Sequence, residues 1–219
     1  MQVWEVRDMA RVETNMQALR SYPRTVWTFI KSAVSPEMTP FLFFLDFLVH
    51  PPIILASIAW GLYINQTHSI WLALAMVPVG VLTWTLVEYL VHRFILHRIP
   101  GLQDMHQAHH NETQELIGTP TPVSLPLLLL VVLWPMTYAL GTSLALLWFA
   151  GFLIGFIAYT FVHYAVHHLS SGGWSWMKQL KFQHNVHHHG TSNQNFGVST
   201  ALWDHVFRTY SSTMGKAEH

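Results

Sequence analysis

The sequence predicts an all-α integral membrane protein with about four transmembrane helices and a polar helical cap. Three observations favour this class. Hydrophobic residues make up 51% of the 219-residue chain and charged residues only 10%, whereas soluble domains average about 25% charged residues. Four apolar runs are each long enough to cross a bilayer, which takes roughly 20 helical residues. Polar segments lie between the second and third runs and after the fourth, so that a cap forms on one side of the predicted bundle.

Composition excludes several classes of function. The chain has eleven basic and eleven acidic residues, so no net field attracts nucleic acid. The absence of cysteine excludes disulfides and thiolate metal ligands. The N-terminus carries charges of both signs and lacks the apolar core of a secretory signal. We therefore expect the internal apolar runs to direct membrane insertion.

The length leaves room for one domain with short appendages. We expect an N-terminal segment, 1–35, followed by a four-helix membrane domain, 36–219. The N-terminal segment mixes charged and aromatic residues, which suits either a helix at the headgroup level or a cytosolic arm packed on the domain. The cap should comprise about residues 92–118 and 163–212.

The first apolar run, Phe41–Ile64, contains ionisable residues. Asp46 and His50 lie four residues apart, on one face of a helix, and Pro51 and Pro52 follow them. The prolines predict a kink. Ionisable residues at membrane depth are functional by default, but we favour a structural hydrogen bond between Asp46 and His50 that closes the kink.

The second run, Ile70–Leu96, is longer than the bilayer is thick. From Ser69 to Arg98 a helix would extend about 45 Å, so its last turns must emerge into water. Those turns carry His92 and His97. Glu88 precedes His92 by four residues, and a carboxylate on that face is placed to orient the imidazole.

The third and fourth runs form a hairpin. Three prolines lead into the third run, which ends at Leu140, and the tight turn 141–143 joins it to the fourth run, Leu144–His168. His163 lies 21 residues beyond Thr142, in the turn before the fourth run. His92 lies 23 residues beyond Ser69, in the turn before the second run. The two sets of histidines should therefore sit at nearly the same depth.

Basic residues predict the orientation of this bundle. All eleven lie in residues 7–31, at Arg93 and Arg98, or from Lys178 onward, and neither short turn between the runs has one. Lys and Arg are retained on the cytoplasmic side. We expect both termini and the cap to be cytoplasmic.

Ten of the sixteen histidines fall into four short groups: His92 and His97; His106, His109 and His110; His163 and His167; His184, His187 and His188. Neutral imidazole is the commonest metal ligand, and a nitrogen-rich set without sulfur suits iron, zinc, copper or nickel. Ten ligands are too many for one ion, while two ions would have about five nitrogens each. A two-metal centre is therefore the first hypothesis.

Helical spacing supports this hypothesis in three of the four groups. His163 and His167 are four residues apart and share a face, and both triplets do the same. His92 and His97 are five apart and separated by roughly 140° on an ideal helix. Either the helix distorts there or these two serve different metals. Five of the other six histidines are given an ordinary structural interpretation: His50, His68, His168, His189 and His219.

A histidine site at the membrane surface beside long apolar helices suits the oxidation of a lipid chain that enters from the bilayer. The chain has neither a Gly-rich phosphate loop nor an H-E-x-x-H zinc protease motif. A metal transporter or metal sensor is the alternative class, but it needs ionisable residues along the midplane. Only Asp46 and His50 qualify there.

The histidine groups stand in the motifs EYLVHRFILH, MHQAHH, AYTFVHYAVHH and LKFQHNVHH, followed by the tail NFGVSTALWDHVFRTY. In order, type and tail the chain resembles the membrane fatty acid hydroxylase and sterol desaturase superfamily, and most closely its fatty acid 2-hydroxylases. The resemblance covers about residues 80–212. Four ordered clusters make it specific, where a single one would be weak.

This resemblance implies a dimetal monooxygenase that adds a hydroxyl next to an acyl carboxyl or amide carbon. The ten cluster histidines carry over as metal ligands, with iron in the active enzyme, dioxygen as co-substrate, and zinc able to replace iron during expression. Tyr159 and Tyr164 match residues near the substrate head or bound oxygen, although interfacial aromatics are an equal alternative. Trp203 and Asp204 should pack the cap and hold a ligand histidine.

Two departures affect the expected partners. The interval between His97 and His106 is short compared with the eukaryotic hydroxylases, so the loop over the site must differ. The H-P-G-G haem motif of their fused cytochrome domain does not occur here, so electrons should come from a separate b5-type cytochrome or a ferredoxin with its reductase. Free acids, sphingolipids and other acyl lipids all remain candidate substrates, and sterol or carotenoid hydroxylation or desaturation remains an alternative.

Overall fold

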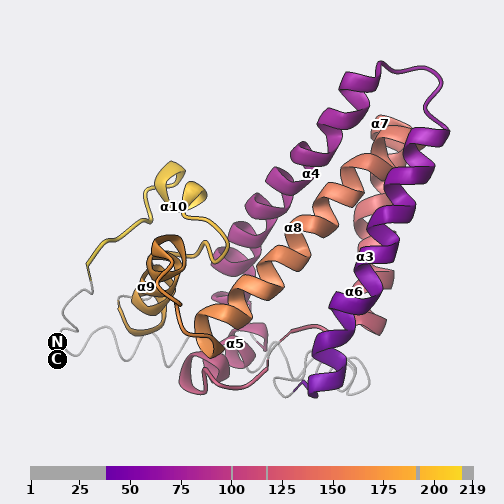
Figure 1. Cartoon of the computed structure of the whole chain (residues 1–219). Helices are drawn as coiled ribbons and strands as arrows, with labels where there is room; N and C mark the ends of the chain where they lie inside the picture. Colours follow the sequence, from indigo (N-terminus) through magenta and orange to yellow (C-terminus); the bar gives the residue numbers. More distant parts are fainter. Residues whose placement is uncertain (1–37, 100, 117, 191–192, 214–219) are drawn as a thin grey trace.

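The computed structural model describes residues 38–99, 101–116, 118–190 and 193–213, and this part of the chain is helical without strands (Figure 1). The predicted segment 1–35 and His219 lie outside the described residues. Four helical spans are long and apolar enough to cross a membrane: α3 (Pro40–Tyr63), α4 (Ile70–Leu90) with its extension η1 (Val91–Leu96), the succession α6 (Thr121–Leu127), η2 (Leu128–Leu133) and α7 (Trp134–Leu140), and α8 (Thr142–His168). The predicted four-helix fold is confirmed.

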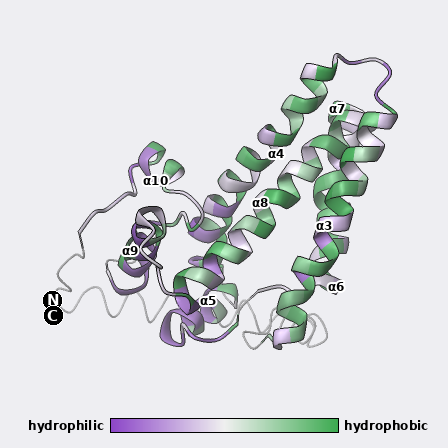
Figure 2. Ribbon diagram, in the orientation of Figure 1, coloured by the Kyte–Doolittle hydropathy of each residue, from purple (hydrophilic) through white to green (hydrophobic). Residues whose placement is uncertain are grey.

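Three further helices, α5 (Leu102–Asn111), α9 (Ser175–His189) and α10 (Leu202–Val206), lie toward one end of the bundle (Figure 1). Hydrophilic residues concentrate on these helices and at the adjoining ends of the long ones, whereas the spans are mostly hydrophobic (Figure 2). The helical cap is therefore at the end where α4 and α8 finish.

Helix α8 is the centre of the bundle and packs against α4, α3 and α7. Half of its most apolar window is buried, against 6 to 22% in the other three spans. Its buried side chains include Leu147, and those of Trp148, Phe149, Phe152 and Leu153 form one core cluster. The other spans turn most of their apolar surface outward, as helices facing lipid do.

Two glycines allow α4 and α8 to approach closely. A Cβ added to Gly80 would lie 1.9 Å from the backbone oxygen of Trp148, and one added to Gly151 would lie 1.9 Å from that of Val77. Each glycine therefore faces the backbone of the other helix. Membrane helices associate mainly through close van der Waals packing, because lipid tails are as apolar as the helices and the hydrophobic effect does not drive association. Small residues at the contact allow this close packing.

Exposed aromatic residues gather near the turns at the other end of the bundle. Trp60, Tyr63, Trp71 and Tyr138 are each more than half exposed and lie within about one turn of those ends. Aromatic belts of this kind mark the interface between membrane and water. Their position agrees with spans that finish at these turns.

Candidate metal centre

The segment that carries the first two histidines is a π-helix. Residues 91–96 form η1, whose i→i+5 hydrogen bonding brings residues five apart onto one face. His92 and His97 consequently lie together, with ring centroids 5.1 Å apart. Of the two alternatives left by their spacing, helix distortion is the one that the structure shows.

The first histidine group combines η1, α5 and α9. Its members, whose ligand atoms all lie within 4.8 Å of one another, are His92, His97, His106, His110 and His187. His106 is at its centre, because its Nε2 lies 2.9 Å from that of His92 and 3.1 Å from those of His97 and His110. A neutral imidazole has a single N–H, so hydrogen bonds cannot account for all of these contacts. Converging lone pairs of this kind could hold a cation.

The nitrogen separations also fit a metal quantitatively. With metal–nitrogen distances of about 2.1 Å, neighbouring ligands of an octahedral ion are separated by about 3.0 Å and those of a tetrahedral ion by about 3.4 Å. The Nε2 atoms of His97 and His187 are 3.0 Å apart, close to the separations of 2.9 to 3.1 Å between His106 Nε2 and its three neighbours. The first group therefore matches a high-coordinate ion better than a tetrahedral one.

The second group combines α5, α8 and α9. It consists of His109, His163, His167 and His184. The Nε2 atoms of His109 and His163 are 3.0 Å apart, and those of His167 and His184 are 2.8 Å apart. As the four-residue spacing predicted, His163 and His167 project from one face of α8 and belong to the same group.

His188, the tenth predicted ligand, belongs to neither of these groups as the distances define them. Its ring stacks on His110 with centroids 4.1 Å apart and lies 4.5 Å from the ring of His184. Both of its ring nitrogens are buried, and neither has a hydrogen-bond partner in the described part of the chain. A buried imidazole with two unsatisfied nitrogens is unusual and is compatible with a metal ligand; the assignment of His188 as a ligand remains a prediction.

Burial keeps the cap histidines neutral. Burial, with a smaller contribution from repulsion by His110, lowers the pKa of His97 to about 4 and that of His187 to about 3. The pKa of His109 falls to about 3, mainly by burial and then by repulsion from His167. Neutral rings keep the lone pair that a metal requires, so the group is ready to bind cations at neutral pH.

Backbone carbonyls fix the tautomers of two rings. His92 Nδ1 donates to the carbonyl of Phe196 at 2.5 Å, and His187 Nδ1 donates to that of Gln194 at 2.9 Å. Carbonyl oxygens only accept, so both Nδ1 atoms carry the proton and both Nε2 atoms keep their lone pairs for the site. Metal-binding histidines commonly use the second nitrogen in this way.

Asp204 holds the segment that supplies these carbonyls. Its carboxylate accepts from the backbone N–H groups of Phe196 and Gly197, each at 2.8 Å, and from Thr209 Oγ1 at 2.7 Å. Asp204 thus acts on His92 through the backbone of residue 196. Trp203, also singled out by the tail motif, donates from Nε1 to Thr85 Oγ1 at 3.0 Å and fastens the cap to α4.

Glu88 has a different partner from the one expected. Instead of contacting His92, its carboxylate accepts from the backbone N–H groups of Val198 at 2.7 Å and Ser199 at 2.9 Å, and from the Ser199 hydroxyl. Unpaired N–H groups are costly to bury. The carboxylate of Glu88 therefore pairs with the N–H groups of Val198 and Ser199, although His92 lies four residues along the same helix face. Glu88 and Asp204 therefore anchor successive parts of one segment.

Sequence reasoning missed Asn195, which shapes the same segment. Its φ of 53° lies in the left-handed region, which asparagine tolerates better than most residues. Its side chain accepts from the Ser211 N–H at 2.8 Å and donates to the Ser211 carbonyl at 2.9 Å. Asn195 stands between Gln194 and Phe196, whose carbonyl oxygens accept the hydrogen bonds from His187 and His92, so its turn sets where both oxygens point. The only available signal was its place in the tail motif.

A cavity of about 380 Å³ opens from the histidines into the bundle. Its walls come from α3, α4, η2 and α8 and are mainly apolar, while histidines of both groups line one part of it. Tyr159 and Tyr164, the predicted substrate residues, both line it. Tyr164 stacks on His168 with centroids 4.5 Å apart and also contacts the ring of Phe43. The cavity is thus a mainly apolar space that reaches both histidine groups.

Four apolar spans and two histidine groups that could hold metal ions define an integral membrane protein with a candidate metal centre at one end of its helices. The Fatty acid hydroxylase family model matches residues 77–209, which is more than half of the chain. The chain therefore belongs to the fatty acid hydroxylase family.

Relatives with curated names are similar over more than half of the chain. Fatty acid 2-hydroxylase of Rattus norvegicus is 34% identical over 142 residues, covering 59% of this chain and 38% of the relative. Dihydroceramide fatty acyl 2-hydroxylase FAH2 of Arabidopsis thaliana is 34% identical over 142 residues, covering 61% and 60%. Among solved structures, full-length scs7p, in which only the hydroxylase domain is visible, has a TM-score of 0.62 at 26% identity, covering 78% of this chain and 67% of that one. The chain thus spans less than half of the rat protein.

Proposed function

We propose that this protein is a membrane-bound monooxygenase that hydroxylates a lipid acyl chain, at the 2-position of a fatty acid or fatty acyl lipid. The observation that carries the proposal is an apolar cavity at membrane depth that ends at two groups of converging histidine nitrogens. The names of the relatives add the position of the hydroxyl group. In this reaction one atom of dioxygen enters the lipid and the other leaves as water.

The ten cluster histidines are proposed to hold two metal ions, iron in the active enzyme. When bound, these ions supply the dioxygen chemistry needed to oxidise an unactivated C–H bond. The protein's own part is orientation and exclusion of water. Phe196 and Gln194 fix two rings so that Nε2 faces the site, and the cavity walls keep an acyl chain extended beside it. Tyr159 and Tyr164 are placed to contact the chain near its head.

We also propose a single membrane domain, 36–219, with the cap, both termini and the site in the cytoplasm. The support is the distribution of Lys and Arg, since none lies in either turn at the opposite end. Electrons would reach the site from a separate donor protein. A cysteine introduced at Gln66 should react with an impermeant thiol reagent added outside, and one at Lys178 should not; the reverse labelling would overturn the orientation.

The proposed activity predicts a lipid product. Cells expressing the chain with a b5-type or ferredoxin reductase system should contain acyl chains heavier by one oxygen, with the hydroxyl at carbon 2, as read by mass spectrometry of total lipids. Cells with the empty vector are the control. Unchanged lipids with altered cellular metal content would favour the transporter class. A product lacking two hydrogens would show desaturation, and a hydroxyl elsewhere would refute the 2-position.

A further inference from the structure

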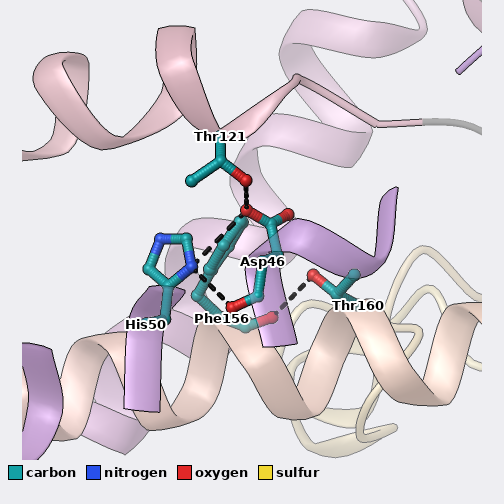
Figure 3. Close-up of polar contacts among 5 residues, drawn as sticks. All are labelled: Asp46, His50, Thr121, Phe156 and Thr160. Carbon is teal, nitrogen blue, oxygen red and sulfur yellow. Dashed lines mark hydrogen bonds and ion pairs between the residues drawn. The ribbon is translucent and has the colours of Figure 1, made fainter. Parts of the chain in front are cut away.

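A carboxylate lies in the wall of the lipid cavity at membrane depth. Asp46 on α3 is only 4% exposed and lines the cavity. Thr121 Oγ1 donates to its Oδ1 at 2.6 Å, and His50 Nδ1 donates to its backbone oxygen at 3.0 Å, with Oδ1 at 3.4 Å (Figure 3). The predicted Asp46–His50 contact is therefore present, but its hydrogen bond uses the backbone oxygen of Asp46. The carboxylate itself is left with few donors.

The other two buried carboxylates of the described chain show how unusual this is. Asp204 accepts hydrogen bonds from three donors and so does Glu88, in each case with both oxygens in use. Asp46 has one hydrogen-bond donor to its side chain, and that donor takes Oδ1. Figure 3 shows the second oxygen directed away from Thr121, and no described residue donates to it. Buried polar groups normally have partners, so the partner is expected to come from the cavity.

A second polar atom in the same wall is also without a partner. Ser124 lies one turn beyond Thr121 and lines the cavity, and its buried Oγ has no hydrogen-bond partner among the described residues. Two residues with unsatisfied polar atoms, on the adjoining helices α3 and α6, therefore line one cavity. In a cavity built only for a hydrocarbon tail, apolar residues would be cheaper at both positions.

We infer that Asp46 is a specificity-determining residue that accepts a hydrogen bond from the polar head of the lipid. This inference rests on the proposed function and adds to it the chemistry of the head. An N–H or O–H group of an acyl amide or hydroxylated lipid can donate to Oδ2. An ester has no donor, and an ionised free acid has only acceptors and repels a carboxylate. Thr121 positions the acceptor by holding Oδ1.

The test compares one acyl chain presented as the N-acyl derivative of aminoethanol, as the methyl ester and as the ionised acid. Binding to the full-length, metal-free protein in detergent is measured by competition with a fluorescent fatty amide. The wild type should bind the amide tightest. Asp46→Asn should weaken binding of the amide lipid about tenfold, because the side-chain NH2 of Asn then faces the cavity where the carboxylate accepted a hydrogen bond. Binding of the ester, which has no donor, should stay within about twofold of the wild type.

Two further variants separate recognition from folding. Thr121→Val keeps the carboxylate but frees it, so amide binding should fall by a smaller factor while thermal stability changes little. Asp104→Asn, an exposed site on α5, is the matched control and should bind all three lipids as the wild type does. Equal affinity of the wild type for amide and ester would overturn the inference. So would equal weakening of both by Asp46→Asn, because that result shows a structural carboxylate.

The outcome is independent of the proposed oxygen chemistry, because binding is measured without metal. Donor-dependent binding in a protein that hydroxylates no lipid would refute the proposed function and leave the inference standing. Hydroxylation that proceeds equally well with amide and ester, and equally in the wild type and Asp46→Asn, would refute the inference and leave the proposed function standing.

Discussion

Replacing His106 by alanine should reduce lipid hydroxylation to below about one hundredth of the wild-type level. Its Nε2 lies within 3.1 Å of three other Nε2 atoms, so the change opens the centre of the first group. Substitutions that only support a metal ligand already cost about 10- to 100-fold, and losing a ligand should cost more. The measurement is the amount of hydroxylated acyl lipid per amount of purified protein.

His189→Ala is the matched control for this substitution. His189 directly follows the α9 histidines, but it is exposed and belongs to neither group. It should retain most of the activity. Equal losses in both variants, or an active His106→Ala protein, would show that the converging histidines are not the reactive centre.

Replacing Gly151 by leucine should prevent the bundle from assembling. Even a Cβ at this position would lie 1.9 Å from the backbone oxygen of Val77, so α4 and α8 must separate to admit a side chain. Overpacking in well-packed cores costs about 1–3 kcal/mol and sometimes more, and here a backbone is the obstacle. We expect a loss of stability of about 3 kcal/mol or more, seen in detergent as aggregation or a strongly lowered melting temperature.

Ala158→Leu provides the comparison, since it adds similar bulk to an exposed position of the same helix. It should melt close to the wild type. If Gly151→Leu also melts there, the close approach of α4 and α8 does not hold the bundle together. Moving α4 and α8 apart would also disturb the site. The segment η1, which carries His92, continues α4, and His163 and His167 lie on α8.

Much of the fold, and the gathering of histidines at one end of it, could be predicted because both depend on local patterns. The length of an apolar run decides whether it spans the membrane, and a four-residue spacing brings His163 and His167 to one face. The five-residue spacing of His92 and His97 left two alternatives, since no feature of VHRFIL reveals a π-helix in advance. How nine of the ten histidines divide between the two groups depends on the docking of α5 and α9, which sequence spacing does not specify.

Contacts between distant segments were harder to predict. Glu88 appeared to be placed for His92, but the unpaired N–H groups of residues 198 and 199 compete for its carboxylate. The hydrogen bond from Thr121 to Asp46 joins residues 75 positions apart and depends on how α6 packs on α3. In both cases the partner is set by tertiary packing, and a single sequence carries no record of that.

The number of metal ions per chain tests the central claim most directly. Elemental analysis of purified protein should give about two equivalents of iron or zinc for the wild type, because the two histidine groups are separate sets of converging nitrogens. His106→Ala and His184→Ala, one from each group, should each lower the count toward about one. A reproducible single equivalent in the wild type, unchanged by one of these substitutions, would contradict a dinuclear centre.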